Sequence, residues 1–324
     1  MSFFSKLKRE VWRVVRTLLV VAVISSVVIT LISYGKKIKR PDTFSMIIDS
    51  DSGNEIDDLF AITYALIHPK LEIIGLSSAQ WNMHPRAGDS SVYVSQKINE
   101  DLLRLHDTIE IPHPLGANDQ TGYWGDTKPI PSDAANFILE RAKATPYGKK
   151  LNIVTLGAVT NLATAIMLDT TIVKKIVWYG MGLSYDEKFR VWNKNEFNTR
   201  NDLDAMDYLL NREGLETHIM TTNTSRSYTF GRVETNDLIE ARGPKWDYLV
   251  DRWKKIAPQS RDWIMWDVAL IQAIMNPDLV TEKEVSTPDE NVSRKIFVYT
   301  WIDEEKMKRA YWKMVRVEMR DLSE

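Results

Sequence analysis

The sequence predicts an α/β protein with a mostly parallel, Rossmann-like central sheet, helices on both faces, and one N-terminal transmembrane helix ahead of it. The first observation is that short apolar runs alternate with amphipathic helical stretches after Pro41, a pattern typical of parallel sheets. The second is that no Gly/Ser-rich linker interrupts residues 44–324, which predicts a single domain. The third is an uncharged, mostly apolar run at residues 17–34.

The individual elements follow from the hydrophobic pattern. Apolar runs bounded by turn residues predict strands at residues 44–48, 71–79, 151–157, 174–182 and 216–223. Apolar residues at helical spacing predict helices at residues 56–69, 132–144 (with Ser132 as N-cap), 158–169, 202–213 and 262–275. The polar segment 223–260 is interpreted as a loop or lid, and residues 294–315 as an edge strand followed by a closing helix.

The composition excludes several classes of function. The formal net charge of the 324-residue chain is -2, so no basic surface for nucleic acid is expected. The chain contains no Cys, which excludes disulfides, thiolate catalysis and Cys-ligated zinc. A protein without Cys is indifferent to the redox state of its compartment, so an exported location is compatible with the sequence.

The N-terminal region is predicted to be separate from the globular domain. Residues 1–16 form a short basic tail, residues 17–34 an apolar segment of nearly bilayer-spanning length, and residues 35–43 a basic linker. We interpret residues 17–34 as an uncleaved signal anchor of a single-pass membrane protein, with the catalytic domain on the non-cytoplasmic side. The alternatives are a cleaved signal peptide, with a weak small-x-small site at residues 33–35, and a buried helix.

An acidic cluster marks the candidate site. The stretch "IIDSDSGNEIDDLF" at residues 47–60 carries five carboxylates directly after a predicted strand: Asp49, Asp51, Glu55, Asp57 and Asp58. Like charges at this spacing repel unless a cation offsets them, and hard divalent cations prefer oxygen ligands. A helix N-terminus also favours acidic residues. That alternative accounts for two of the carboxylates, but not for those at the end of the strand.

The cluster belongs to a series of motifs that resembles the inosine/uridine-preferring nucleoside hydrolases. "DSDSGNEIDD" is similar to the aspartate signature of that family, which reads Asp-x-Asp-Pro-Gly-x-Asp-Asp. Four further segments fall in the family's order over roughly residues 44–320: "GLSSAQWN" at 75–82, "TLGAVTNLATAI" at 155–166, "NEFNTRNDLDAM" at 195–206 and "WDVAL" at 266–270. The resemblance implies calcium-dependent hydrolysis of the N-glycosidic bond of ribonucleosides or related ribosides.

The resemblance also implies roles for particular residues. The Ca²⁺ ligands would be the carboxylates of Asp51, Asp58 and Asp267 together with the backbone carbonyl of Leu156. Asp51 would also act as the general base that takes a proton from the attacking water.

The substrate-binding residues that the resemblance implies surround the sugar and the base. Asp57 and Asn198 would hold the ribose hydroxyls, Asn82 would touch the sugar or water, and Glu196 would lie at the 5′ end. Without the resemblance, Glu196 and Asn198 would be interpreted as a helix cap and a surface group. Asp267 within the apolar stripe "WIMWDVALI" needs a buried partner, which favours a metal site.

The sequence departs from the family on the side of the leaving base. The acidic signature carries an insertion, and Ser52 replaces the family's Pro. Trp266 stands where many relatives have a His, so Trp266 is predicted to contact the base. The family's His-Gly loop has no clear counterpart, although Tyr123 and Trp124 in "TGYWGD" could stack on a base. Of the five histidines, only His84 is placed near the pocket.

Two other functions stay open at this point. The first is a membrane-tethered riboside-binding protein without turnover, which the absent histidines motivate. The second is a Mg²⁺-dependent phosphatase of the haloacid-dehalogenase type, whose later acidic pair is incomplete in "GMGLSYD" at residues 180–186. The expected partners are a small nucleoside or riboside, the membrane through the N-terminal helix, and a second copy in a homo-oligomer.

Overall fold

The structure is a computed structural model that describes residues 12, 43–122 and 125–321. The predicted signal anchor at residues 17–34 lies outside the described residues, as does the basic tail ahead of it except for residue 12. Within the part of the chain that is described, no helix combines the length and the apolar composition needed to cross a membrane. Residues Phe44–Glu324 form one compact unit, and the description below concerns that unit.

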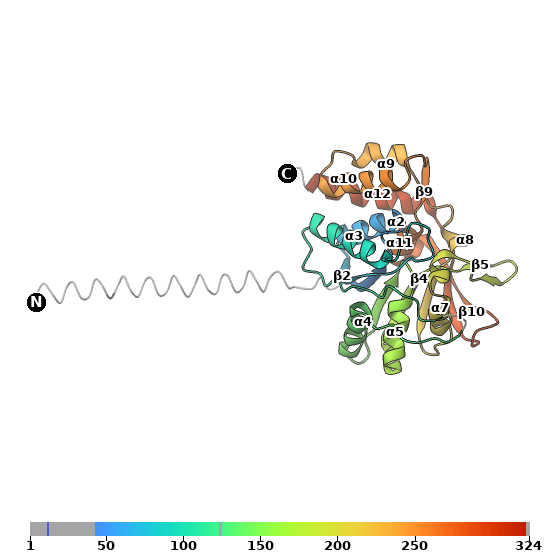
Figure 1. The fold of residues 1–324 in the computed structure, drawn as a ribbon. Coiled ribbons are helices and arrows are strands. Elements are labelled where there is room, and N and C mark those ends of the chain that lie inside the picture. Colours follow the sequence, from blue (N-terminus) through green and yellow to red (C-terminus); the bar gives the residue numbers. More distant parts are fainter. Residues whose placement is uncertain (1–11, 13–42, 123–124, 322–324) are drawn as a thin grey trace, which may run out of the picture. The chain divides into compact units, whose positions relative to one another are not determined.

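A seven-stranded sheet forms the centre of this unit, in the order β10-β11-β7-β4-β3-β1-β2 (Figure 1). All neighbouring strands are parallel except β10 and β11, so the predicted mostly parallel sheet is confirmed. The strands are β1 (Phe44–Ser50), β2 (Leu71–Ser78), β3 (Leu151–Thr155), β4 (Ile176–Met181), β7 (Glu216–Met220), β10 (Val280–Ser286) and β11 (Lys295–Ile302).

The strand β1 shows why this sheet is covered on both faces. Met46, Ile47 and Ile48 are consecutive, and each is fully buried. Side chains alternate between the faces of a strand, and accordingly Met46 and Ile48 join one hydrophobic core while Ile47 joins the other. A continuous apolar run is therefore the expected sequence of a strand with helices on both sides.

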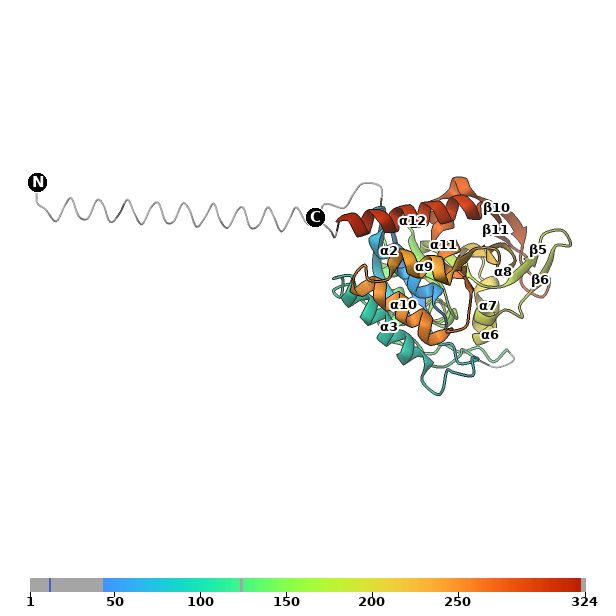
Figure 2. The same cartoon turned by 90° about the horizontal axis from the view of Figure 1, so that it is seen from above.

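The two helical layers correspond to the two cores (Figures 1 and 2). One face carries α2 (Asp57–Ile67), α3 (Ser91–Leu105), α11 (Trp266–Met275) and α12 (Glu304–Asp321). The other face carries α4 (Asp133–Ala144), α5 (Thr160–Leu168) and α7 (Leu203–Leu210). Ser132 caps α4 as predicted, because its side chain accepts a hydrogen bond from the backbone N–H of Ala135 (3.1 Å). Helices on both faces are thus confirmed.

The prediction of a loop or lid at residues 223–260 is wrong. This segment contains two substantial helices, which add to the layer over α2 and α3. Trp246, Leu249, Val250 and Trp253 form a buried stripe on the second of them, at spacings typical of an amphipathic helix. The abundant charged residues on its outer face concealed this stripe. The elements here are α8 (Thr222–Ser225), β8 (Thr229–Gly231), α9 (Arg232–Ile239) and α10 (Pro244–Ile256).

Two further expectations are corrected, and one helix is additional to those predicted. The C-terminal strand β11 is not an edge strand, because β10 pairs with it antiparallel and takes the edge. The helix predicted at residues 262–275 begins only at Trp266, since Asp262–Ile264 form strand β9, which pairs with β8. The helix α3 was not predicted at all. The remaining short elements are η1 (Thr170–Lys175), β5 (Ser184–Asp186), β6 (Val191–Asn193), α6 (Phe197–Asn201) and η2 (Pro277–Leu279).

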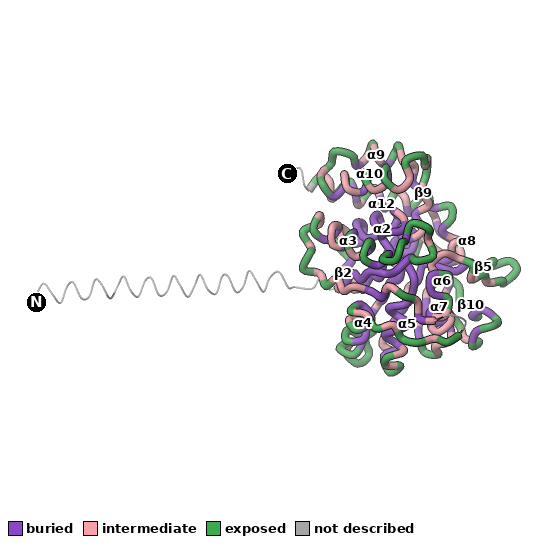
Figure 3. Tube along the Cα trace, viewed as in Figure 1, coloured by how far each residue is buried: buried purple, intermediate pink, exposed green. Residues whose placement is uncertain are grey.

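The strand order creates a crevice between β1 and β3. The chain passes from β1 to β2 on one side, and then returns to place β3 on the other side of β1. Ligands of open α/β sheets collect at the carboxyl ends of strands where the order reverses in this way. Buried residues run along the sheet and the helices next to it (Figure 3), so a polar group at this point is enclosed by core on both sides.

Candidate active site

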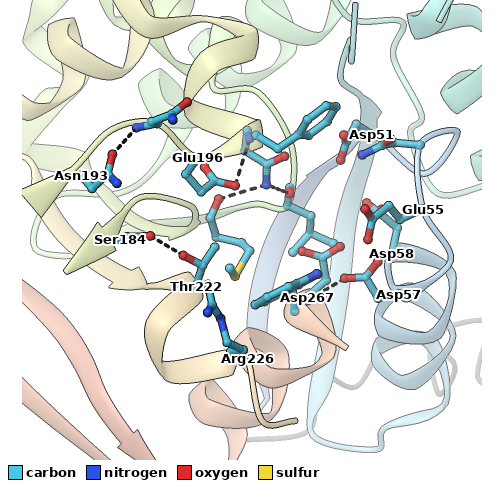
Figure 4. A pocket seen from close by; sticks show the side chains of 17 residues that line it. Asp51, Glu55, Asp57, Asp58, Ser184, Asn193, Glu196, Thr222, Arg226 and Asp267 are labelled. Atoms are coloured by element: carbon cyan, nitrogen blue, oxygen red, sulfur yellow. Dashed lines mark hydrogen bonds between the residues drawn. The ribbon is translucent and has the colours of Figure 1, made fainter. Parts of the chain in front are cut away.

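A pocket of about 390 Å³ opens at the carboxyl ends of the central strands (Figure 4). Each of β1, β3, β4 and β7 contributes residues at or just after its carboxyl end. The lining residues are Asp51, Asn54, Glu55, Asp57, Asp58, Leu156, Met181, Ser184, Asn193, Asn195, Glu196, Phe197, Asn198, Thr222, Arg226, Trp266 and Asp267. Every predicted site residue except Asn82 is among them, although these residues span more than two hundred positions of the sequence.

Asn82 is not brought to this pocket. Its side-chain amide donates a hydrogen bond to the backbone carbonyl of Asn118 (2.6 Å), and its carbonyl oxygen accepts one from the hydroxyl of Ser91. The residue is exposed. The loop after β2 therefore uses Asn82 to fix its own conformation, and the prediction that Asn82 touches the sugar has no support from the geometry.

Three aspartates form the floor of the pocket. Carboxylate oxygens of Asp57, Asp58 and Asp267 lie within 4.8 Å of one another, and all three residues are buried. Asp57 accepts a hydrogen bond from the backbone N–H of Asp267 (3.2 Å), and Asp58 accepts one from the hydroxyl of Ser50 (2.7 Å). Asp57 and Asp58 begin α2 and Asp267 lies at the start of α11, so the ends of two packed helices bring the cluster together.

Asp51 faces this cluster from the end of β1. Only 2% of the residue is exposed, and its Oδ2 atom has no hydrogen-bond partner among the described residues. A Cβ atom added to Gly157 would lie 2.7 Å from Oδ1 of Asp51, so the close approach of the loop after β3 requires glycine there. A buried carboxylate oxygen without a donor is costly, and a bound cation would satisfy it.

The electrostatics of the floor indicate the same ligand. Burial, and then the charges of neighbouring carboxylates, raise the pKa values of Asp51, Asp57 and Asp267 well above the ordinary value. Burial raises the pKa of Asp58 to about 7, against the effect of its hydrogen bond from Ser50. Protons or a cation must therefore offset these charges near neutral pH. The all-oxygen donor set fits a hard divalent ion such as Ca²⁺ or Mg²⁺.

Asp49 is separate from this cluster, although the sequence groups it there. Its carboxylate accepts hydrogen bonds from Ser77 Oγ (2.6 Å) and from Asn161 Nδ2 (3.0 Å), and it does not line the pocket. Burial raises its pKa to about 6. Asn161 also accepts a hydrogen bond from the backbone N–H of Ala117 (2.9 Å). Asp49 therefore ties β1 to β2 and α5 behind the pocket.

The wall opposite the aspartates is built on α6. Asn198 donates from Nδ2 to the backbone carbonyls of Leu156 (2.6 Å) and Met181 (3.2 Å), as the dashed lines in Figure 4 show. Glu196 is the N-cap of α6 and accepts hydrogen bonds from the backbone N–H groups of Asn198 (3.0 Å) and Thr199 (3.0 Å). The helix-cap interpretation of Glu196 is thus confirmed, and the same carboxylate lines the pocket.

Sequence reasoning missed the residues that hold the inserted loop. Ser95 and Asn99 lie on the unpredicted helix α3, where the hydroxyl of Ser52 donates to Oδ1 of Asn99 (2.6 Å). Asn99 in turn donates to the backbone carbonyl of Ser77 (3.1 Å). Both α3 residues are fully buried. The signal was present in the sequence as small polar residues at positions 91, 95 and 99, which share one face of a helix.

The mouth of the pocket has a different character. Glu55 accepts a hydrogen bond from the indole N–H of Trp263 (3.2 Å), and Trp266 lines the pocket beside Asp267. Among the described residues no histidine lines the pocket. His84 does not itself line the pocket. Its ring packs edge-on against Phe197, which does line it, with ring centroids 6.1 Å apart. Tyr123 and Trp124, which were predicted to stack on a base, lie outside the described residues.

Comparisons with known proteins identify the family of this chain. A family profile described as inosine-uridine preferring nucleoside hydrolase matches residues 46–321. Uridine nucleosidase 1 of Arabidopsis thaliana is 28% identical over 271 residues, which cover 74% of this chain and 76% of that protein. Probable uridine nucleosidase 2 of the same plant is 31% identical over 152 residues, covering 42% of this chain but only 45% of that protein.

The solved structures show the same fold. An inosine-guanosine nucleoside hydrolase superposes with a TM-score of 0.63 at 19% identity, covering 84% of this chain and 98% of that one. The family profile spans most of the chain and leaves no place for the phosphatase alternative. The chain therefore belongs to the inosine-uridine preferring nucleoside hydrolase family and is a hydrolase that acts on N-glycosyl bonds.

Proposed function

We propose that this protein hydrolyses the N-glycosidic bond of ribonucleosides or related ribosides, releasing ribose and the free base, and that it requires Ca²⁺. The observation that carries the proposal is the buried oxygen Oδ2 of Asp51, which has no hydrogen-bond partner in the described part of the chain and faces a pocket floored by Asp57, Asp58 and Asp267. Such a floor is unfavourable without a cation. The floor suits a ligand whose own oxygens can bind the same cation, as the two hydroxyls of a sugar diol can.

The residues present fit a calcium ion. We assign Asp51, Asp58, Asp267 and the backbone carbonyl of Leu156 as the protein ligands. The Leu156 carbonyl already accepts a hydrogen bond from Asn198, but a carbonyl oxygen has a second lone pair for a metal. When bound, the ion would supply a positive charge that orients the sugar hydroxyls and makes a nearby water easier to deprotonate.

The chain's own residues perform the remaining steps. Asp51 takes a proton from the water that attacks C1′ of the ribose. Asp57 and the side-chain oxygen of Asn198 accept hydrogen bonds from the ribose hydroxyls, because the Asn198 amide donors are already used. The C1′–N bond breaks and its electron pair moves onto the base, leaving positive charge on the sugar ring.

Electrostatic preorganisation stabilises that positive charge. The carboxylates are held by the starts of α2 and α11 and by the end of β1, so little reorganisation is needed as the charge develops. Glu196 lies at the 5′ side of the sugar, and Trp266 offers its indole face to the base. Burial raises the pKa of Glu196, so a 5′ hydroxyl is better accommodated there than an anionic group.

The test uses full-length protein in mild detergent with p-nitrophenyl β-D-riboside. Nitrophenolate leaves without protonation, so this substrate tests the sugar half of the site alone. Release that depends on Ca²⁺ and stops with chelator supports the proposal. Release that is unaffected by chelator would contradict the proposed calcium requirement. Absence of release at any calcium concentration would contradict the proposed hydrolase function.

A second candidate is riboside binding without turnover. The observation in its favour is that no histidine lines the pocket in the described part of the chain, so the usual proton donor for a leaving base is missing. Isothermal titration with ribose in the presence of Ca²⁺, together with the absence of nitrophenol release, would favour this candidate.

We also propose that residues 17–34 anchor the protein in a membrane, with residues 44–324 as the catalytic domain on the non-cytoplasmic side. The support is the uncharged apolar run between two basic segments. Retention in membranes after alkaline extraction, and cleavage of the domain by protease added to intact spheroplasts, would test the two parts. Light scattering of the purified protein would test the homo-oligomer.

A further inference from the structure

The pocket is strongly asymmetric in charge. Six carboxylates line it, whereas Arg226 is the single cationic side chain lining it in the described ranges. A carboxylate-rich site stabilises the cationic sugar of the transition state but repels the other product. The base departs with the electron pair of the C1′–N bond and carries negative charge until it gains a proton. Some group at the mouth must therefore offset that charge.

The backbone around Arg226 is held firmly. Arg226 follows α8 directly, and its N–H donates to the carbonyl of Thr222 (3.1 Å). On either side, Ser225 and Tyr228 are fully buried, and the Tyr228 hydroxyl donates to Gln272 (2.7 Å). The guanidinium thus extends from a fixed point on the pocket wall beside Thr222 (Figure 4).

The segment that carries Arg226 is tied to the chain just before the predicted base-contacting residue, Trp266. The backbone N–H of Met265 donates to the carbonyl of Tyr228 (2.7 Å). This bond joins the segment just after Arg226 to the residue just before Trp266, and α8 packs against α11. Arg226 and Trp266 therefore belong to one wall of the mouth, and both line the pocket.

The guanidinium itself is uncommitted. Among the described residues it has no hydrogen-bond or ion-pair partner, although six carboxylates line the same pocket. The residue is exposed at the mouth, where solvent weakens but does not abolish its field. Guanidinium N–H groups suit the carbonyl oxygens of a base, because they are planar and permanently charged.

We propose that Arg226 is a catalytic residue that stabilises the departing base as an anion, in place of a proton donor. This inference rests on the proposed hydrolase function. As the C1′–N bond breaks, its electron pair delocalises onto a carbonyl oxygen of the base, where Arg226 donates hydrogen bonds. The hydroxide from the attacking water remains on C1′, its proton goes to Asp51, and the base takes a proton from solvent after release. The expected substrates are nucleosides whose base carries a carbonyl oxygen.

The experiment measures kcat/KM for a series of substituted phenyl β-D-ribosides, from p-nitrophenyl to unsubstituted phenyl, with full-length protein in detergent and Ca²⁺. The variants are Arg226→Met, Arg226→Lys and the control Arg242→Met, which changes an exposed arginine away from the pocket. Arg226→Met should lose roughly tenfold or more on the phenyl riboside but little on p-nitrophenyl riboside, so that the dependence on leaving-group pKa becomes steeper.

Arg226→Lys should fall between Arg226→Met and the wild type, and Arg242→Met should match the wild type. A uniform loss across the whole series would assign Arg226 a structural role and overturn the proposal, and so would no loss at all. Wild-type protein that releases no nitrophenol would instead remove the underlying hydrolase function. Melting temperatures of all variants separate misfolding from a change in chemistry.

Discussion

The floor and the mouth of the pocket differ in burial and in charge. The floor is buried, rich in carboxylates and built from the ends of β1, β3, α2 and α11. The mouth is more exposed and combines Trp266, Arg226 and Glu55. In the proposed mechanism, the floor matches what a cationic sugar and a divalent ion require, whereas the mouth would meet a leaving base whose charge is negative. The difference would then mean that the sugar chemistry is kept while the means of releasing the base is changed.

The largest expected effect is at the floor. Asp51→Asn removes the proposed general base and one ligand of the ion, so kcat for p-nitrophenyl riboside should fall by roughly 10²- to 10⁴-fold. Steady-state release of nitrophenolate at saturating Ca²⁺ measures this. An Asp51→Asn protein that keeps the full rate would show that another group accepts the proton.

Next in size is the loss of a metal ligand. Asp58→Asn removes a charge from the ion site and should weaken Ca²⁺ binding by at least about 100-fold, since even supporting partners of metal ligands are worth 10- to 100-fold. Isothermal titration calorimetry provides the value. The matched control is Asp49→Asn, which changes another buried aspartate with a serine partner outside the pocket. It should leave Ca²⁺ affinity nearly unchanged, and an equal loss in both variants would contradict the assignment.

A smaller effect is expected at the mouth. Trp266→Ala removes the aromatic surface beside the base, and stacking of this kind is worth about 0.5–1.5 kcal/mol. The kcat/KM for inosine should therefore fall by about 2- to 12-fold, and that for uridine and p-nitrophenyl riboside by less, because their smaller rings stack over a smaller area. Parallel losses on all three substrates would place Trp266 in the support of the floor instead.

The smallest expected effect is a shift in stability with pH. Asp58 has a folded pKa of about 7, raised from 3.8, so without Ca²⁺ the folded state holds a proton that the unfolded state releases. The stabilisation from that proton is present at low pH and is lost as pH rises through about 7. The melting temperature gained on adding Ca²⁺ should therefore be larger at pH 8 than at pH 5.5. Differential scanning fluorimetry measures it, and an equal gain at both pH values would contradict the charged-floor description.

Much of the fold was predictable because its signals are local. The apolar run Met46–Ile48 predicts a strand buried on both faces, and Ser132 predicts the start of α4. The helix α10 was missed because its four buried apolar residues are separated by charged ones, which dominate the average polarity of the segment. The edge position of β10 could not be inferred, since strand order depends on pairing between distant segments.

The site was predictable where chemistry depends on residue type, and less so where it depends on neighbours. Buried acids such as Asp267 stand out in an apolar helix whatever the surroundings. In contrast, Asp49 lies on β1 and Asp51 directly after it, yet Asp49 binds Ser77 and Asn161 behind the pocket while Asp51 enters it. Only the packing of β2 and α5 distinguishes them. Asn82 likewise followed the expected motif, but its side chain is bonded to Asn118 and Ser91 outside the pocket.

The antiparallel strand β10 also limits how copies of this protein can associate. It borders the sheet, and its central residues Glu282, Lys283 and Glu284 are exposed. A row of charged side chains on an open margin opposes the addition of a strand from another molecule. Joining two sheets through this margin would bring like charges together and displace the ion pair between Lys283 and Glu187. Self-association, where it occurs, is thereby directed away from the β10 margin.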